Sequence, residues 1–214
     1  MDAHDLPQRQ VDHQVFVDTT LAGVLDDGRD ADAIAYDREP AEYRHCRLLD
    51  HPRGDWADTI ARRYLYDTAD AVRLEAVVGS VWAPLAELAA KIRREERYHL
   101  MHVGSWLERL ALGGGESRPR LEAALGRLAP DVATVFAPLG DGDALVEAGI
   151  LAAPMEALDV RWRASIEPTF RRLGLALLPP ATDPARGRLD HSAAFAWLHD
   201  EFTMVRRLDP VATW

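Results

Sequence analysis

The chain of 214 residues is long enough to bury a core as one domain, and it is acidic, with 35 Asp and Glu against 25 Lys and Arg. A formal charge of -10 without any long basic run argues against a nucleic-acid or anionic-membrane surface. The single cysteine, Cys46, excludes an internal disulfide framework, and neither a secretion signal nor a bilayer-length apolar run is visible. We therefore expect a cytoplasmic protein.

Helix signals follow one another along the chain, whereas the alternating pattern of strands is nearly absent. Proline in a first turn, aspartate or serine as an N-cap and glycine after a last turn mark the boundaries. These signals predict helices over about residues 8–25, from Pro40, then 55–78, 84–112, 117–138, 154–173 and 191–208. Pro168 is expected to kink the helix that contains it. Long helices joined by short loops predict an all-α antiparallel bundle.

Polar residues occupy positions on two of these helices where a bundle normally has apolar ones. In the helix from Pro84, steps of three and four connect Leu85, Leu88, Ile92, Glu95, His99, His102 and Trp106. A similar stripe in the preceding helix contains Asp67. Buried carboxylates are costly unless they are paired, hydrogen-bonded or metal-bound. The sequence therefore predicts a buried polar network of Asp67, Asp70, Glu95, Glu96, His99 and His102.

A carboxylate-bridged di-metal site is one interpretation of this pattern. Ferritin-like bundles build such a site from a Glu on each of two helices and an E-x-x-H pair on each of the other two. The candidate ligands here are Asp67, Asp70, Glu96, His99 and Glu156, an oxygen-rich set that suits iron or manganese. The other interpretation, a hydrogen-bonded network that fixes helix register, is favoured because only one full E-x-x-H pair is present. His191 and His199 are expected to be surface or capping residues.

Three segments together resemble a known family: DWADTIARRYLYD, KIRREERYHLMHVGSWLERLALGGGESRPRLEAALGRL and the terminal HDEFTMVRRLDPVATW. They are similar to the PaaC family, the structural, non-catalytic subunits of bacterial phenylacetyl-CoA epoxidase. The signature residues are Asp58, Arg62, Tyr64, Tyr98, His99, Trp106, Arg207, Pro210 and Trp214. The resemblance covers about residues 54–214. It implies a single domain over 1–214 in which residues 1–53 are a shortened N-terminal part, without the family's first helix.

The resemblance implies a ferritin-like fold and a place in a multicomponent monooxygenase of aerobic phenylacetate catabolism. A homologous catalytic subunit would carry the di-iron site and bind most of the aromatic acyl-CoA substrate, and a reductase component would hold flavin and an iron–sulfur cluster. This chain would then have no catalytic residue, metal or cofactor of its own. Two alternatives stay open: a free-standing or divergent di-metal oxidase or oxygenase, and a degenerate helical paralogue with a binding or regulatory role.

Overall fold

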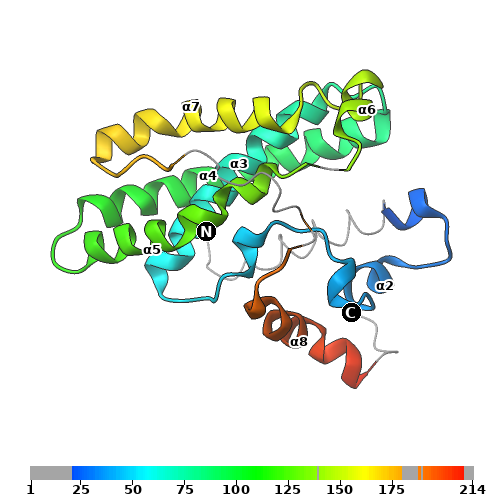
Figure 1. The fold of residues 1–214 in the computed structure, drawn as a ribbon, viewed down its shortest axis with the longest axis horizontal. Coiled ribbons are helices and arrows are strands. Elements are labelled where there is room, and N and C mark those ends of the chain that lie inside the picture. Colours follow the sequence, from blue (N-terminus) through cyan, green and yellow to red (C-terminus); the bar gives the residue numbers. More distant parts are fainter. Residues whose placement is uncertain (1–20, 139, 180–187, 189, 210–214) are drawn as a thin grey trace. The chain divides into compact units, whose positions relative to one another are not determined.

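The computed structural model describes residues 21–138, 140–179, 188 and 190–209 (Figure 1). Every regular element in these residues is a helix and none is a strand, which confirms the all-α prediction. No helix in the described part of the chain is long and apolar enough to cross a membrane. Contacts divide the chain into two compact units, unit 1 with residues 1–43 and 193–214 and unit 2 with residues 44–192. The single domain over 1–214 stays a prediction.

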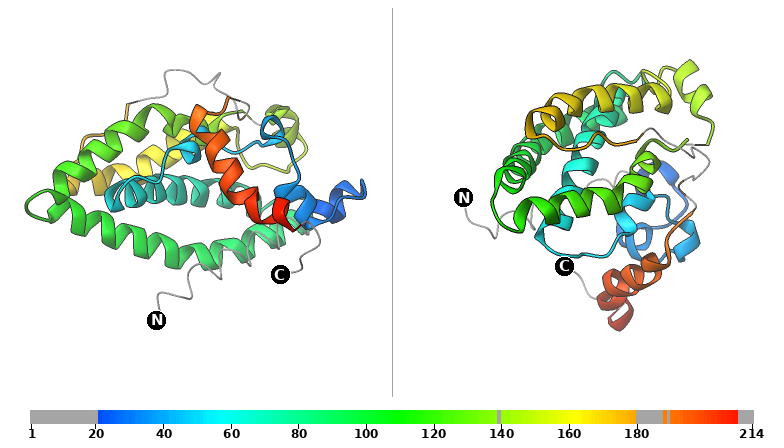
Figure 2. Two further views of the ribbon diagram at one scale, coloured as in Figure 1. Left: turned by 90° about the horizontal axis from the view of Figure 1, so that it is seen from below. Right: turned by 60° about the vertical axis from the view of Figure 1, so that its left-hand side comes forward.

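Unit 2 is a helical bundle built from four long helices: α3 (Trp56–Val78), α4 (Ala83–Leu112), α5 (Ser117–Val132) and α7 (Met155–Leu173). Helix α3 packs against each of the other three (Figures 1 and 2). The shorter elements of this unit are η2 (Arg47–Asp50), η3 (Ala133–Phe136) and α6 (Gly142–Glu147). This arrangement is consistent with a ferritin-like fold.

Local capping sets the ends of the two central helices. Asp55 accepts hydrogen bonds from the backbone N–H groups of Ala57 and Asp58, and the Asp58 carboxylate accepts one from the N–H of Asp55. This reciprocal capping box satisfies donors that the first turn leaves unpaired. Helix α4 has proline in its first turn and Gly113 directly after its last residue. Both helices therefore begin and end within one residue of the predicted positions.

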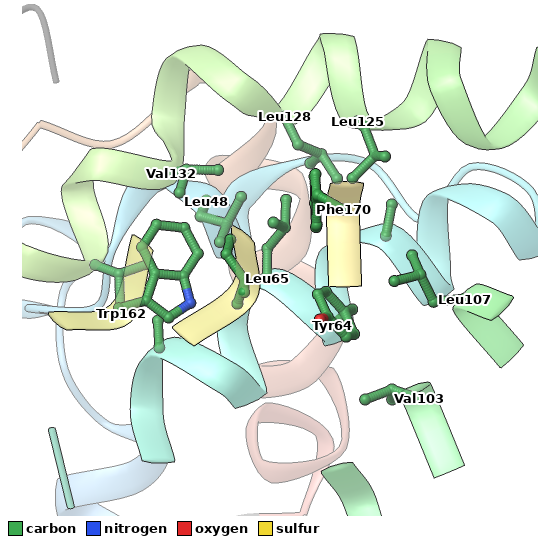
Figure 3. Packing of buried hydrophobic residues seen from close by; sticks show 14 of the residues in the cluster. Leu48, Tyr64, Leu65, Val103, Leu107, Leu125, Leu128, Val132, Trp162 and Phe170 are labelled. Carbon is green, nitrogen blue, oxygen red and sulfur yellow. The ribbon is translucent and has the colours of Figure 1, made fainter. Parts of the chain in front are cut away.

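The core of unit 2 is apolar and lies where α3, α5 and α7 meet (Figure 3). Trp162 and Phe170 of α7 and Leu65 of α3 are completely buried. The Trp162 indole Nε1 donates a 2.9 Å hydrogen bond to Thr68 Oγ1, so its one polar group is satisfied inside the core. Burying side chains of this size supplies most of the stability of such a bundle.

Several elements differ from the prediction. The helix expected to reach Pro138 ends at Val132 and continues as the tighter helix η3. Helix α6 forms where no helix was predicted. Helix α7 runs through Pro168 to Leu173, as predicted, and the kink expected at Pro168 stays a prediction. Of the predicted helix 8–25, only residues 21–25 are described, and these are helical.

The described part of unit 1 contains α2 (Ala31–Tyr36), η1 (Pro40–Glu42) and α8 (Ala193–Leu208). Tyr43 packs edge-on against the rings of Phe195, His199 and Phe202. His199 is buried in this aromatic cluster, and its Nε2 lies 3.1 Å from the carbonyl oxygen of Arg38. The prediction that His199 lies at the surface is therefore wrong, because the rings of unit 1 enclose it.

Candidate functional site

The buried face of α4 is rotated away from the predicted seam. Its buried residues are Ala89, His99, Val103, Leu107 and Ala111. His102 is exposed, so it lies outside the buried network in which the sequence placed it. Glu95 is half-buried. Neighbouring helical residues are about 100° apart around the axis. A small rotation of α4 about its axis, relative to the predicted orientation, therefore places Val103 in the core and His102 in solvent while His99 stays buried.

Asp67 is the most deeply buried acidic group on this part of α3, with 3% of its surface exposed. Its Oδ2 lies 3.2 Å from Nη2 of Arg63, one turn earlier, but this oxygen accepts no hydrogen bond of good geometry. Burial raises the pKa of the Asp67 carboxyl to about 7, against the opposing effect of Arg63 and with a further increase from Glu96. The carboxyl therefore changes its protonation near neutral pH.

The neighbouring polar groups are paired within their own helices. Arg73 Nη1 donates a 2.9 Å hydrogen bond to Asp70 Oδ1, and burial raises the Asp70 pKa against the effect of this arginine. On α4, His99 Nδ1 lies 3.1 Å from Glu96 Oε1. This hydrogen bond raises the His99 pKa, although burial lowers it. The E-x-x-H pair thus forms a hydrogen-bonded pair along one helix.

The contacts around the candidate metal ligands test whether these residues fit a di-metal centre. Asp67 and Asp70 each have an arginine as their nearest charged partner, and a guanidinium competes with a metal cation for the carboxylate. Glu156 is exposed at the start of α7, where it lines a separate shallow cleft. In the described residues, this set does not bring three ligand atoms within 4.8 Å of one another. As arranged, these residues do not fit a carboxylate-bridged di-metal centre.

Several signature residues hold helix ends and loops in place. Arg127 Nη2 donates a 2.5 Å hydrogen bond to Asp58 Oδ1, linking α5 to the start of α3. Arg62 Nη1 donates to the carbonyl oxygens of His51 and Pro52, at 2.7 and 2.9 Å. Tyr64 is buried in the core. These residues therefore maintain the connection between the loop before α3 and the bundle.

Of the other signature residues, Tyr98 and Arg207 lie at the surface and Trp106 is half-buried. Tyr98 is exposed on α4, and Trp106 packs edge-on against Trp56 with ring centroids 5.3 Å apart. In α8, Arg207 Nη1 donates a 2.9 Å hydrogen bond to Asp200. Pro210 and Trp214 lie outside the described residues.

A second polar cluster was not predicted from the sequence. The ligand atoms of His45, Asp50 and His191 all lie within 4.8 Å of one another. His191 is half-buried in this cluster, whereas a surface or capping position was expected. No local spacing in the sequence marks the group, because His45 and Asp50 lie near the first residue of unit 2 and His191 lies next to its last residue.

Comparison with known proteins connects the geometry to a family. Residues 17–214 match the family model described as phenylacetic acid catabolic protein. The chain is 33% identical over 137 residues to one of the subunits of the 1,2-phenylacetyl-CoA epoxidase of Escherichia coli (strain K12). That alignment covers 64% of this chain and 55% of the relative, so the chain spans little more than half the length of the protein it matches. Because the family model matches most of its length, this chain belongs to the family of phenylacetic acid catabolic proteins.

Proposed function

We propose that this chain is a non-catalytic, complex-forming subunit of a phenylacetyl-CoA epoxidase-type oxygenase. The name of the E. coli relative supports the choice of complex. A homologous ferritin-like subunit would hold the di-iron site and most of the acyl-CoA substrate, and a reductase with flavin and an iron–sulfur cluster would supply electrons. The observation that carries the non-catalytic role is the pairing of Asp67 and Asp70 with arginines of their own helix.

Arginine pairing suits a structural role better than oxygen activation. A di-iron centre needs carboxylates that are free to bridge and bind two cations. Here Arg63 and Arg73 offset the negative charge, and His99 is held by Glu96. Because each of these pairs lies within one helix, the register of α3 against α4 would depend on the charge interactions of Asp67 with Glu96 and His99, which a shifted register would change.

The outer face of α4, defined by Tyr98, Met101 and Leu112, supports a role in assembly. These side chains are 53%, 65% and 66% exposed. Their spacing of three and eleven residues places them on one side of the helix, opposite the buried Val103 and Leu107. Tyr98 and Met101 are neighbours one turn apart, and Leu112 lies about three turns further along the same side. Large exposed apolar side chains aligned along one helix face are typical of a protein–protein interface. We propose that this face contacts the catalytic subunit.

Co-purification with that subunit tests the interface. The double variant Tyr98→Asp/Met101→Asp should lower the affinity for the catalytic subunit by about 100-fold or more, because two central apolar contacts are replaced by charges. Val160→Asp is the matched control, since Val160 is also an exposed apolar residue, 67% exposed, but lies on α7. The control should retain wild-type affinity. Equal binding by all three proteins would contradict the proposed interface.

Elemental analysis of iron and manganese tests the non-catalytic role. The protein should be expressed without an affinity tag in medium supplemented with both metals, and we expect no pair of iron or manganese ions per chain. A di-metal oxidase is the second candidate, because α4 carries one E-x-x-H pair, Glu96 with His99. About two iron or manganese ions per chain, lost on His99→Gln, would establish that candidate and overturn the proposal.

A further inference from the structure

The second polar cluster of unit 2 has the composition of a transition-metal site. His45 Nε2 lies 2.6 Å from Asp50 Oδ1, and His191 Nδ1 lies 3.5 Å from Asp50 Oδ2. The two imidazole rings stack with centroids 4.2 Å apart and planes inclined by 27°. Each ring therefore approaches a different oxygen of one carboxylate, and one ligand atom from each of the three side chains lies within 4.8 Å of the others.

The carboxylate of the cluster is buried and hydrogen-bonded to the backbone. Asp50 is the last residue of η2 and is 1% exposed, and His45 lies just before that helix. The backbone N–H of Ser192 donates a 2.6 Å hydrogen bond to Asp50 Oδ2. A donor of this kind orients a carboxylate, as the outer-shell partners of metal ligands do.

The composition of this cluster differs from that of a simple ion pair, because two imidazole rings face a single carboxylate. The arginine close by in the sequence, Arg47, pairs with two other aspartates, Asp131 at 3.2 Å and Asp190 at 3.1 Å. Imidazole nitrogens and a carboxylate oxygen are ligands that zinc takes in proteins.

The distances are close to those that a metal requires. Zinc–nitrogen and zinc–oxygen bonds of about 2 Å in a tetrahedral site place ligand atoms about 3.3 Å apart. The 2.6 Å contact between His45 Nε2 and Asp50 Oδ1 would open slightly, and the proton that it holds would pass to solvent. The 3.5 Å contact of His191 is to the other oxygen, Oδ2, so an ion would lie between the two carboxylate oxygens, and the stacked rings would turn toward it. The His45 side chain is 23% exposed, so water can reach a fourth coordination position.

We infer that His45, Asp50 and His191 form a binding site for one divalent transition-metal ion, of the class to which Zn²⁺ belongs. Imidazole nitrogens favour such ions over Mg²⁺ or Ca²⁺, which prefer sites made only of oxygen. The ion would connect the first and the last residues of the chain segment that forms unit 2, since His45 lies close to its first residue and His191 close to its last. Its role is therefore to fasten the fold, separately from the cluster between α3 and α4.

Calorimetric titration of the full, metal-stripped chain with ZnCl₂ tests the site. We expect one tight Zn²⁺ site per chain and no comparable site for Mg²⁺. His45→Gln and His191→Gln should each lower the Zn²⁺ affinity by more than about 10- to 100-fold, the loss typical for an outer-shell partner alone. His51→Gln is the matched control, because His51 is also half-buried beside an aspartate, Asp131, at 2.8 Å. This control should bind Zn²⁺ as the unsubstituted chain does.

The same titration of His99→Gln identifies which cluster takes the metal. Unchanged Zn²⁺ binding supports the site at Asp50, whereas loss of the tight site only in His99→Gln would assign it to α4 and overturn the inference. Equal binding by the unsubstituted chain, His45→Gln and His191→Gln would also overturn it. Helical circular dichroism verifies that each variant is folded. Should His191→Gln unfold, the result for the more exposed His45→Gln decides.

Discussion

Asp50 and Asp67 are both almost completely buried in unit 2, with 1% and 3% of their surface exposed, yet their acidities change in opposite directions. Burial raises the pKa of both carboxyls. At Asp50 the hydrogen bonds from His45 and from the Ser192 N–H outweigh burial, and the pKa is lowered. At Asp67 burial dominates, and the pKa rises to about 7.

The difference lies in the partners rather than in the depth of burial. Both Asp50 oxygens accept short hydrogen bonds of 2.6 Å, which stabilise the charged form. Asp67 has one arginine at 3.2 Å without good hydrogen-bond geometry, and the carboxylate of Glu96 acts against it. Asp50 is therefore a carboxylate whose charged form is stabilised by hydrogen bonds to both oxygens, whereas Asp67 is a carboxyl with a pKa of about 7.

Removal of the Asp50 carboxylate should have the largest effect. In metal-free protein, Asp50→Ala leaves the Ser192 N–H and His45 without their acceptor inside the fold, so we expect a loss of about 3–5 kcal/mol in the free energy of unfolding. Urea unfolding followed by circular dichroism measures this loss. The exposed Asp143→Ala should change the same quantity by no more than about 0.5 kcal/mol. A loss at Asp50 as small as that of the control would refute the anchoring role.

The pH dependence of Asp67 should be the next largest effect. Because burial raises the pKa of this carboxyl from an ordinary 3.8 to about 7, the folded state binds the extra proton, and stability falls as pH rises from about 4 to 7. At pH 8, Asp67→Asn should be more stable than the unsubstituted chain by about 2–4 kcal/mol, since a tenfold change in acidity corresponds to about 1.4 kcal/mol. Urea unfolding at pH 5 and pH 8 measures this difference.

Asp55→Asn provides the control for the pH experiment. The Asp55 pKa is lowered by the hydrogen bond from the Asp58 N–H and then by Arg120. The stability that the charged Asp55 carboxylate contributes is therefore lost only when the pH falls below the ordinary pKa of an aspartate. Asparagine is also an effective N-cap, and helix α3 should keep its start. The control should therefore retain the wild-type slope between pH 5 and 8. A flat slope in the unsubstituted chain would mean that Asp67 is not the titrating group.

The smallest of these effects is expected at His99. His99→Ala removes the partner of Glu96 at the edge of the buried cluster and should lower the free energy of unfolding by about 1–2 kcal/mol. If the cluster is structural, turnover of the assembled oxygenase should be unchanged once the amount of folded subunit is matched. Thermal melting of the variant measures the loss of stability, and turnover of the reconstituted complex measures any effect on the chemistry. Unchanged melting with abolished turnover would assign His99 to the chemistry.

The sequence by itself determined the helical class and the ends of the central helices. Asp55 with Asp58 at the start of α3, proline in the first turn of α4 and Gly113 after its end act through neighbouring backbone groups. Such capping contacts involve residues no more than a few positions apart, so they can be read without knowing the fold.

The tertiary structure decided which polar groups meet. The exposure of His102 beside the buried Val103 depends on how α4 is rotated against α3, a choice that the periodic pattern left ambiguous. The contact between Asp50 and Ser192 joins residues 142 positions apart. No spacing rule predicts a contact over that distance, because it exists only after the helices between these residues have packed around a common core.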